Sequence, residues 1–317
     1  MDRAQEKVAI ARLSVNSNAV LVVLKLIIGF IMGSVAVFSE AIHSLIDLVA
    51  ALMARYSVVK SAEPADKEHR YGHGKYENLS GMIEGSLIFA AAALIVYEAA
   101  TRFFKHLQVT TLYAGMVIMG ISAAINFEVA RRQSVVAKKT DSLALEADAY
   151  HHYTDVWTSV GVFIALALIQ LTGIQWFDPA VAMIVAVFIS HAAYDITRKS
   201  TEGLLDKSLP ETEIRLIERV VKDHGGSVLN FHKLRARKMG SERQIDLHLV
   251  VPMNLSVKAG HDLVEELEGE IRKDLPGSII VVHIEPCDEN CERCRMIPNL
   301  SPVKGRKAPP LSCEPRK

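Results

Sequence analysis

The chain has no excess of either charge, because Lys plus Arg and Asp plus Glu both total 36 in its 317 residues, so net charge identifies no partner. It contains no basic patch with interleaved aromatic residues, which argues against binding to nucleic acid. No nucleophile–base pair or phosphate-binding loop is apparent, which disfavours an enzyme. Residues 1–13 are charged and lack the layout of a cleavable secretory signal, so we expect the first apolar helix to be an uncleaved anchor.

Hydrophobic residues, by contrast, are abundant. They make up 50% of the chain and its mean hydropathy is +0.20, yet 23% of the residues are charged. This combination indicates a membrane half joined to a soluble half. Six segments approach the roughly 20 residues that a spanning helix needs, and they are Leu13–Val35, Val37–Val59, Leu79–Ala99, Leu112–Ala130, Leu145–Leu171 and Pro179–Ile196.

Positive charge is distributed unevenly between the connecting segments. Lys and Arg gather before the first span, between the second and third spans, and after the fourth, whereas the opposite side has only Arg102 and Lys105 near its loops. The positive-inside rule then predicts that the N-terminus, the 60–78 loop and the C-terminal half are cytoplasmic. We expect an integral protein of a bacterial inner (plasma) membrane, surrounded by lipid.

The pattern changes after Arg198. We predict a helix over Pro210–Asp223, strands over Val228–Lys238 and Arg243–Val251 joined by a hairpin turn at Met239–Glu242, a helix over Val257–Asp274 and a strand over Ser278–Glu285. The expected fold is therefore a six-helix transmembrane protein with a C-terminal α+β domain of order α-β-β-α-β. The expected divisions are an N-terminal segment 1–12, a membrane domain 13–200, a cytoplasmic domain 201–286 and a flexible tail 287–317.

One pattern of ionisable residues occurs twice within apolar helical sequence. Glu40, His43 and Asp47 are spaced i, i+3 and i+7, as are Asp148, His151 and Asp155, so each set shares one helix face. Ionisable residues at membrane depth are costly and usually mark a transport path. Four of the groups, His43, Asp47, His151 and Asp155, would form a shell of two nitrogens and two carboxylates for a tetrahedral divalent metal. The alternative is that they only hydrogen-bond between helices.

Three neighbouring residues leave more than one interpretation open. Glu40 and Asp148 each precede a histidine by one turn, so they either orient that imidazole and relay protons or line the cavity as hydrated carboxylates. His152 points about 100° away from His151. We interpret His152 as a residue that packs or hydrogen-bonds between helices.

Four stretches together resemble the cation diffusion facilitator family over residues 1–286. They are Ser39–Asp47, Pro64–Lys75 with its Tyr71-Gly-His-Gly-Lys75 run, Ala147–Asp155 and the histidine-bearing C-terminal domain. The resemblance implies a homodimer of six-helix protomers with a metallochaperone-like cytoplasmic domain. It also implies export of divalent cations from the cytoplasm in exchange for protons.

The resemblance also implies three metal sites. The central one uses His43 and Asp47 with His151 and Asp155, an arrangement similar to that of zinc-type members. A second lies in the 60–78 loop and uses Asp66 and His73 with His69 nearby, although spacing alone equally allows a purely structural loop. A third is a binuclear site that bridges two protomers through His232, His248, His261, His283 and Glu285. Many relatives have Asp at this last position, and any of these histidines could be an ordinary surface residue.

The leading functional prediction is therefore secondary active export of Zn2+, with Cd2+, Co2+ or Fe2+ also accepted. Metal binding requires neutral imidazole and ionised carboxylate, so a cation that binds displaces protons. One alternative is an Fe2+ or Mn2+ exporter of the same family. Another is a transport-silent metal sensor that uses its cytoplasmic domain as a switch.

Cysteine is rare and confined to the C-terminal end, at Cys287, Cys291, Cys294 and Cys313. A cytoplasmic location disfavours disulfides. The Cys287-x-x-x-Cys291-x-x-Cys294 spacing is compatible with capture of zinc or cadmium by thiolates. The alternative is an unstructured, reduced tail.

Overall fold

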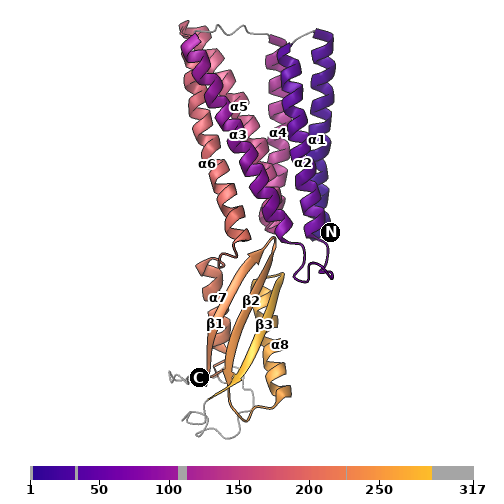
Figure 1. Ribbon diagram of the computed structural model, residues 1–317, viewed down its shortest axis with the longest axis vertical. Coiled ribbons are helices and arrows are strands. Elements are labelled where there is room, and N and C mark those ends of the chain that lie inside the picture. The colour runs from indigo at the N-terminus through magenta and orange to yellow at the C-terminus, as the bar shows by residue number, and fades with distance from the viewer. Residues whose placement is uncertain (1–2, 33–34, 106–112, 226, 288–317) are drawn as a thin grey trace. The chain divides into compact units, whose positions relative to one another are not determined.

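The computed structural model describes residues 3–32, 35–105, 113–225 and 227–287. The chain divides into two compact units, Met1–Leu205 and Asp206–Lys317. The first unit is an up-and-down bundle of helices (Figure 1). Within the described residues, its helices are α1 (Arg3–Met32), α2 (Val35–Ser61), α3 (Lys75–Lys105), α4 (Tyr113–Thr140), α5 (Leu143–Thr172) and α6 (Phe177–Leu204).

A helix therefore lies at each of the six predicted spans. Within the described residues, α1, α2, α3, α5 and α6 are long and apolar enough to cross a membrane. α4 is not among these five, so the fourth membrane span stays a prediction. α4 also continues ten residues beyond the predicted end of its span at Ala130, because the polar and charged residues that follow remain helical to Thr140.

The junction between α4 and α5 fixes where the second polar repeat begins. Asp141 adopts a left-handed conformation, with φ of 56°, and reverses the chain after α4. Ser142 then caps α5 by accepting a hydrogen bond from the backbone nitrogen of Leu145 at 3.5 Å. The repeat follows one turn later, so Asp148, His151 and Asp155 all lie in the first half of α5.

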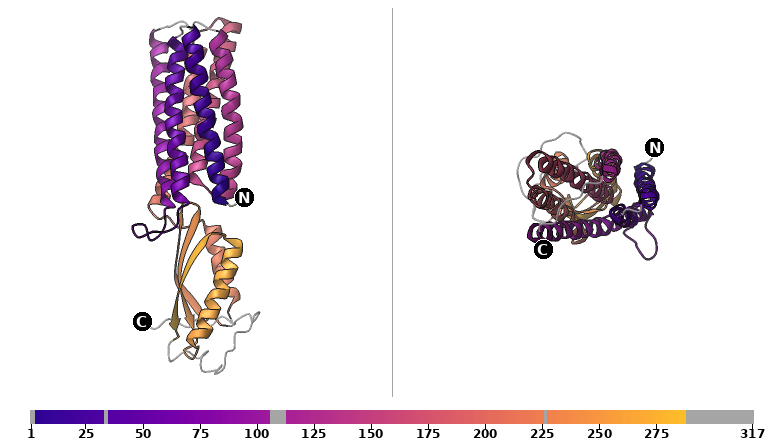
Figure 2. Two further views of the ribbon diagram at one scale, coloured as in Figure 1. Left: turned by 90° about the vertical axis from the view of Figure 1, so that its right-hand side faces the viewer. Right: turned by 90° about the horizontal axis from the view of Figure 1, so that it is seen from above.

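α3 and α6 pack closely because glycine occupies two contact positions on α3. A Cβ atom placed on Gly85 would lie 2.3 Å from Thr197 Oγ1 and 3.3 Å from the backbone oxygen of Ala193. A Cβ atom on Gly81 would lie 2.5 Å from Ser200 Oγ. Small residues four apart let helix backbones approach in a membrane, and Figure 2 shows the bundle from a second side.

The second unit contains α7 (Glu211–Asp223), β1 (Asn230–Met239), β2 (Glu242–Val251), α8 (Val257–Asp274) and β3 (Ser278–Pro286). This confirms the predicted α-β-β-α-β order. The predicted hairpin is also confirmed, because Met239 pairs with Glu242 at the end of the β1–β2 ladder. α8 has the bounds that the sequence predicted, since Ser256 caps its start by accepting from the backbone nitrogen of Ala259 at 3.2 Å.

The sheet has the order β1-β2-β3, with β1 antiparallel and β3 parallel to β2. Alternate residues of β2, namely Ile245, Leu247, Leu249 and Val251, are buried in one core with apolar residues of α7 and α8. His248 lies between them in sequence and therefore faces the other side of the sheet. Strand register places His232, His248 and His283 side by side across the three strands.

Candidate metal centres

Three members of the predicted central site meet between α2 and α5. Nε2 of His151 lies 3.1 Å from Oδ1 of Asp47, and ligand atoms of Asp47, His151 and Asp155 all lie within 4.8 Å of one another. Asp47 and His151 are buried, and Asp155 is partly buried. His151 and Asp155 are four residues apart on α5, so one face of this helix presents both groups to Asp47.

His43 lies beside this group without joining it. Its Nε2 is 3.9 Å from Oδ1 of Asp47, one turn along α2, and its side chain is 51% exposed. Among the described residues, it is absent from the metal-compatible group that contains Asp47. The structure thus brings three of the four predicted ligands together and places the fourth within one turn of them.

Polar neighbours from two further helices surround the group. Nδ2 of Asn126 on α4 donates to Oδ2 of Asp155 at 3.2 Å. Nζ of Lys25 on α1, itself buried, donates to Oγ of Ser44 on α2 at 2.8 Å. Neighbouring residues from α1 and α4 therefore help to hold the two ligand-bearing helices in place.

Asp148 and His152 occupy a separate polar layer on α5. His152 is fully buried, and its Nε2 lies 2.9 Å from Oγ of Ser14 on α1. This confirms the interpretation of His152 as a residue that hydrogen-bonds between helices. Asp148 is 1% exposed and accepts a hydrogen bond from Gln133 of α4. This burial contradicts the alternative in which Asp148 lines the cavity as a hydrated carboxylate. The side chain of Glu40 lies outside the described residues.

Sequence reasoning missed one buried acid near this layer. Glu84 on α3 is 1% exposed and accepts a hydrogen bond from Ser80 Oγ at 3.1 Å through Oε1, while Oε2 has no hydrogen-bond partner among the described residues. Its carboxyl group interacts electrostatically with Asp148 and His151. The sequence signal that could have identified Glu84 is its position as an acidic residue within the apolar span Leu79–Ala99.

The predicted loop cluster is assembled between α2 and α3. Nε2 of His73 lies 3.3 Å from Oδ2 of Asp66, and the rings of His69 and His73 have centroids 4.6 Å apart. The backbone N–H of His69 donates to Asp66 at 2.6 Å, and this bond holds the pKa of the Asp66 carboxyl below its ordinary value. Gly72, with φ of 86°, provides the left-handed turn before His73 that other residues rarely adopt.

The row of histidines on the open face of the sheet converges on one carboxylate. Glu285 lies 2.6 Å from His248 Nδ1, 3.2 Å from His232 Nε2 and 3.7 Å from His283 Nε2. The hydrogen bond from His248 holds the pKa of Glu285 below its ordinary value. His232, His248 and Glu285 form a metal-compatible group, with His283 at its edge.

His261, the fifth predicted member of that site, lies elsewhere in the protomer. It is on α8, where its Nε2 is 3.3 Å from Oε1 of Glu265, and it belongs to no metal-compatible group among the described residues. Of the predicted cysteine cluster, only Cys287 is described. Cys287 is buried with Leu229 and Val250, whereas Cys291, Cys294 and Cys313 lie outside the described residues.

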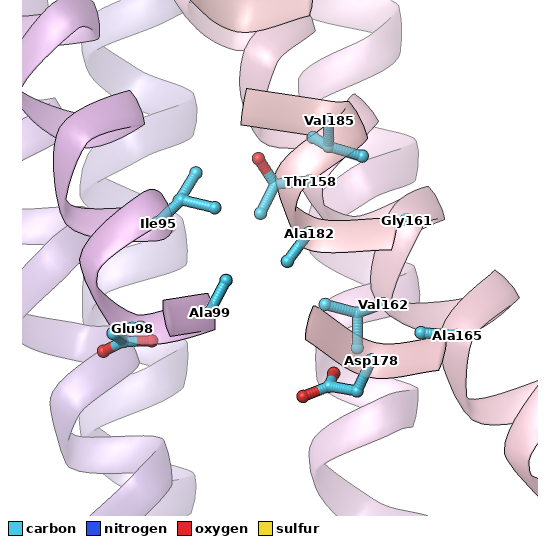
Figure 3. A pocket seen from close by; sticks show the side chains of 10 residues that line it. All are labelled: Ile95, Glu98, Ala99, Thr158, Gly161, Val162, Ala165, Asp178, Ala182 and Val185. Carbon is cyan, nitrogen blue, oxygen red and sulfur yellow. The ribbon is translucent and has the colours of Figure 1, made fainter. Parts of the chain in front are cut away.

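A further pocket lies between α3, α5 and α6, away from these clusters along α5. Ile95 and Ala99 line it from α3, and Val162 and Val185 line it from the facing helices, so its walls are largely apolar (Figure 3). Glu98 and Asp178 contribute carboxylates at the end where α6 begins. No histidine is among the described residues that line the pocket, and we assign it no metal.

Comparison with known proteins covers both units. Residues 11–205 match the family profile of the cation efflux transmembrane domain, and residues 209–287 match ZT_dimer, the profile of the cation efflux protein cytoplasmic domain. The chain is 36% identical to the uncharacterized transporter sll1263 of Synechocystis sp., over 88% of this chain and 90% of that protein. It is 32% identical to the cation-efflux pump FieF of Pectobacterium atrosepticum, over 88% and 93%. It is 30% identical to the uncharacterized transporter MJ0449 of Methanocaldococcus jannaschii, over 87% and 97%.

Proposed function

This chain belongs to the cation efflux family, the cation diffusion facilitators, and from that premise we propose that it exports Zn2+ in exchange for protons. The family makes it a cation efflux transporter of the membrane rather than an enzyme. The choice of zinc, the coupling to protons and the residues that carry the cation are our proposal.

The observation that carries the proposal is the buried group of Asp47, His151 and Asp155 between α2 and α5. We assign His43 as the fourth ligand, since a change in its side-chain rotamer and a small movement of α2 would bring it to the ion. A mixed shell of imidazole nitrogen and carboxylate oxygen suits zinc and its neighbours, whereas Mn2+ favours oxygen. Cd2+, Co2+ and Fe2+ are the further substrates that this shell would accept.

Proton exchange follows from the contact between His151 and Asp47. A proton held between Nε2 and Oδ1, 3.1 Å apart, uses the same two lone pairs that a bound cation needs. A cation arriving from the cytoplasm would release this proton, and protonation from the opposite side would release the cation. Alternating access would come from movement of helix groups around the fixed site.

Orientation rests on the distribution of positive charge. Lys and Arg at the start of α1, in the 60–78 loop and at the end of α4 support a cytoplasmic location for that end of the bundle. We therefore place both termini in the cytoplasm and the protein in a bacterial inner membrane. The predicted divisions at residues 12, 200 and 286 are retained in this proposal.

The cytoplasmic domain belongs to a dimerising family, so the transporter is a homodimer. We propose that His232, His248, His283 and Glu285 bind regulatory zinc at the dimer interface. His261 would join the site across that interface, because among the described residues of one protomer it belongs to no metal-compatible group with the other four residues. The loop residues Asp66, His69 and His73 would hold a further, rapidly exchanging cation.

We expect the purified protein in proteoliposomes to move protons outward from the lumen when Zn2+ is supplied to its cytoplasmic face. Counterflow measured with Zn2+, Cd2+, Co2+, Fe2+ and Mn2+ should rank Zn2+ first and Mn2+ last, because of the two imidazoles in the proposed shell. A higher rate with Mn2+ would contradict the zinc assignment. No flux with any cation would favour a metal-sensing protein instead.

The double variant His232→Ala/His248→Ala is expected to lower the amount of zinc bound by the detergent-solubilised dimer while leaving His151 and Asp155 intact. Each substitution removes an imidazole that contacts Glu285. Glu285 and His283, which remain on this face of the sheet, are too few ligands for tight binding of zinc. Isothermal titration should show the loss of the tight cytoplasmic sites. The matched variant His191→Ala, which removes an exposed histidine of α6, should bind as the parent does.

A further inference from the structure

Among the residues that the structure describes, one group of potential metal ligands lies outside the three predicted sites. His224 caps the C-terminus of α7, and Glu266 and Glu270 are four residues apart on α8. Ligand atoms of all three lie within 4.8 Å of one another. We propose that His224, Glu266 and Glu270 form an additional site in the cytoplasmic domain for a divalent transition-metal cation of the zinc class.

The hydrogen bonding of His224 presents one ring nitrogen to this group as an acceptor. Nδ1 lies 2.9 Å from the backbone oxygen of Val220, and because a carbonyl only accepts, Nδ1 carries the proton. Nε2 of a neutral ring then holds a lone pair. This atom is buried and has no hydrogen-bond partner in the described part of the chain, and it lies 3.9 Å from Oε2 of Glu270. A histidine that ligates a metal commonly donates its other N–H to a carbonyl in this way.

The backbone holds His224 in place before any ligand binds. Its backbone nitrogen lies 3.3 Å from the oxygen of Val221, and its own oxygen accepts from Val228 nitrogen at 3.0 Å. The side chain is 11% exposed. The imidazole therefore has little freedom to turn toward solvent, and the unsatisfied Nε2 remains directed at α8.

The two carboxylates provide the charge and the remaining protein ligands. One neutral imidazole and two ionised glutamates carry a charge of −2 that a divalent cation would neutralise. Ligand atoms on one tetrahedral zinc ion are about 3.3 Å apart. Small rotations of the glutamate side chains, which are partly exposed, would close the observed spacing. Water would complete the shell on the solvent side.

This site is distinct from the proposed regulatory zinc site. His224, Glu266 and Glu270 belong to the helix layer, which covers the face of the sheet that carries Ile245, Leu247 and Leu249. The row of His232, His248 and His283 occupies the other face. A cation here would link α7 to α8 within one protomer, and the inference stands or fails independently of transport.

The test is a count of bound cobalt, with CoCl2 as the probe, on the full-length dimer after removal of metal by a chelator. All variants are made in a protein that already carries Asp155→Asn and His232→Ala/His248→Ala. These three substitutions weaken metal binding at the central site in the membrane and at the proposed regulatory site on the sheet. His224→Gln in this background is expected to lose one Co2+ per chain together with its visible absorption bands. Glu268→Gln, on α8 between the two proposed ligands and paired with Arg272 at 2.7 Å, should keep it.

An unchanged cobalt count in His224→Gln would overturn the site, as would an equal loss in Glu268→Gln. If the three residues form only an ion pair, the substitutions will shift the thermal midpoint of unfolding without changing the count, and the proposal again fails. Should circular dichroism show that His224→Gln does not fold, the variant Glu266→Gln/Glu270→Gln decides the question by the same criteria.

Discussion

Replacement of Asp155 by Asn, or of His151 by Ala, is expected to reduce zinc-driven proton flux in proteoliposomes to the level of empty vesicles. Each change removes a ligand from a group whose members lie within 4.8 Å of one another, and the second also removes the hydrogen bond between His151 and Asp47. A cation stripped of water inside a membrane has few other ligands to replace the one that is lost. Flux would be followed with a pH-sensitive dye trapped in the vesicles.

The next helix supplies a matched control. His191 and Asp195 on α6 repeat the residue types and the i, i+4 spacing of His151 and Asp155, with Nε2 and Oδ2 3.7 Å apart. Their side chains are 79% and 53% exposed, and they belong to no metal-compatible group in the described part of the chain. The variants His191→Ala and Asp195→Asn should transport zinc at the parent rate. Near-parent flux in the His151 and Asp155 variants would refute the central assignment.

The Glu77→Leu variant is expected to lose about 3–5 kcal/mol of stability, the usual effect of removing one partner of a buried ion pair. Glu77 on α3 is fully buried and accepts hydrogen bonds from Lys7 of α1 at 2.8 Å, Ser61 of α2 at 3.0 Å and Ser142 at the start of α5 at 2.7 Å. Loss of this carboxylate removes the ion pair that the buried Lys7 ammonium makes with Glu77. Chemical unfolding in detergent would measure the change.

Two further variants test whether the buried charge is responsible. Adding Lys7→Met to Glu77→Leu should recover part of the stability, because the buried ammonium that has lost its ion pair with Glu77 is then removed as well. Glu146→Gln breaks a partly exposed pair with Lys199 at the same end of the bundle and should cost less than about 1 kcal/mol. An effect of Glu77→Leu no larger than that of Glu146→Gln would show that the buried network contributes little.

Several features followed from local sequence patterns. The apolar runs located α1 to α6, and the switch from helical to alternating periodicity gave the α-β-β-α-β order. The i, i+3, i+7 repeats placed His151 and Asp155 on one face of α5. Each of these properties depends on residues a few positions apart, and turn residues such as Gly240 and cap residues such as Ser256 fixed the ends.

The contacts between segments could not be read in the same way. Packing of α2 on α5 determined that Asp47 meets His151 while His43 stays half exposed. Strand register determined that His232, His248 and His283 lie in a row. His261 is on α8 and does not join them. No sequence spacing relates His224 to Glu266.

The sequence by itself thus determined which helices and strands form and which chemical groups each of them carries, because hydrophobic periodicity and capping act over a few residues. Only the tertiary structure decided which of those groups share a site. That choice depends on the side-chain packing and backbone register of elements that are far apart in the chain; Asp47 and His151, for example, are separated by 104 residues.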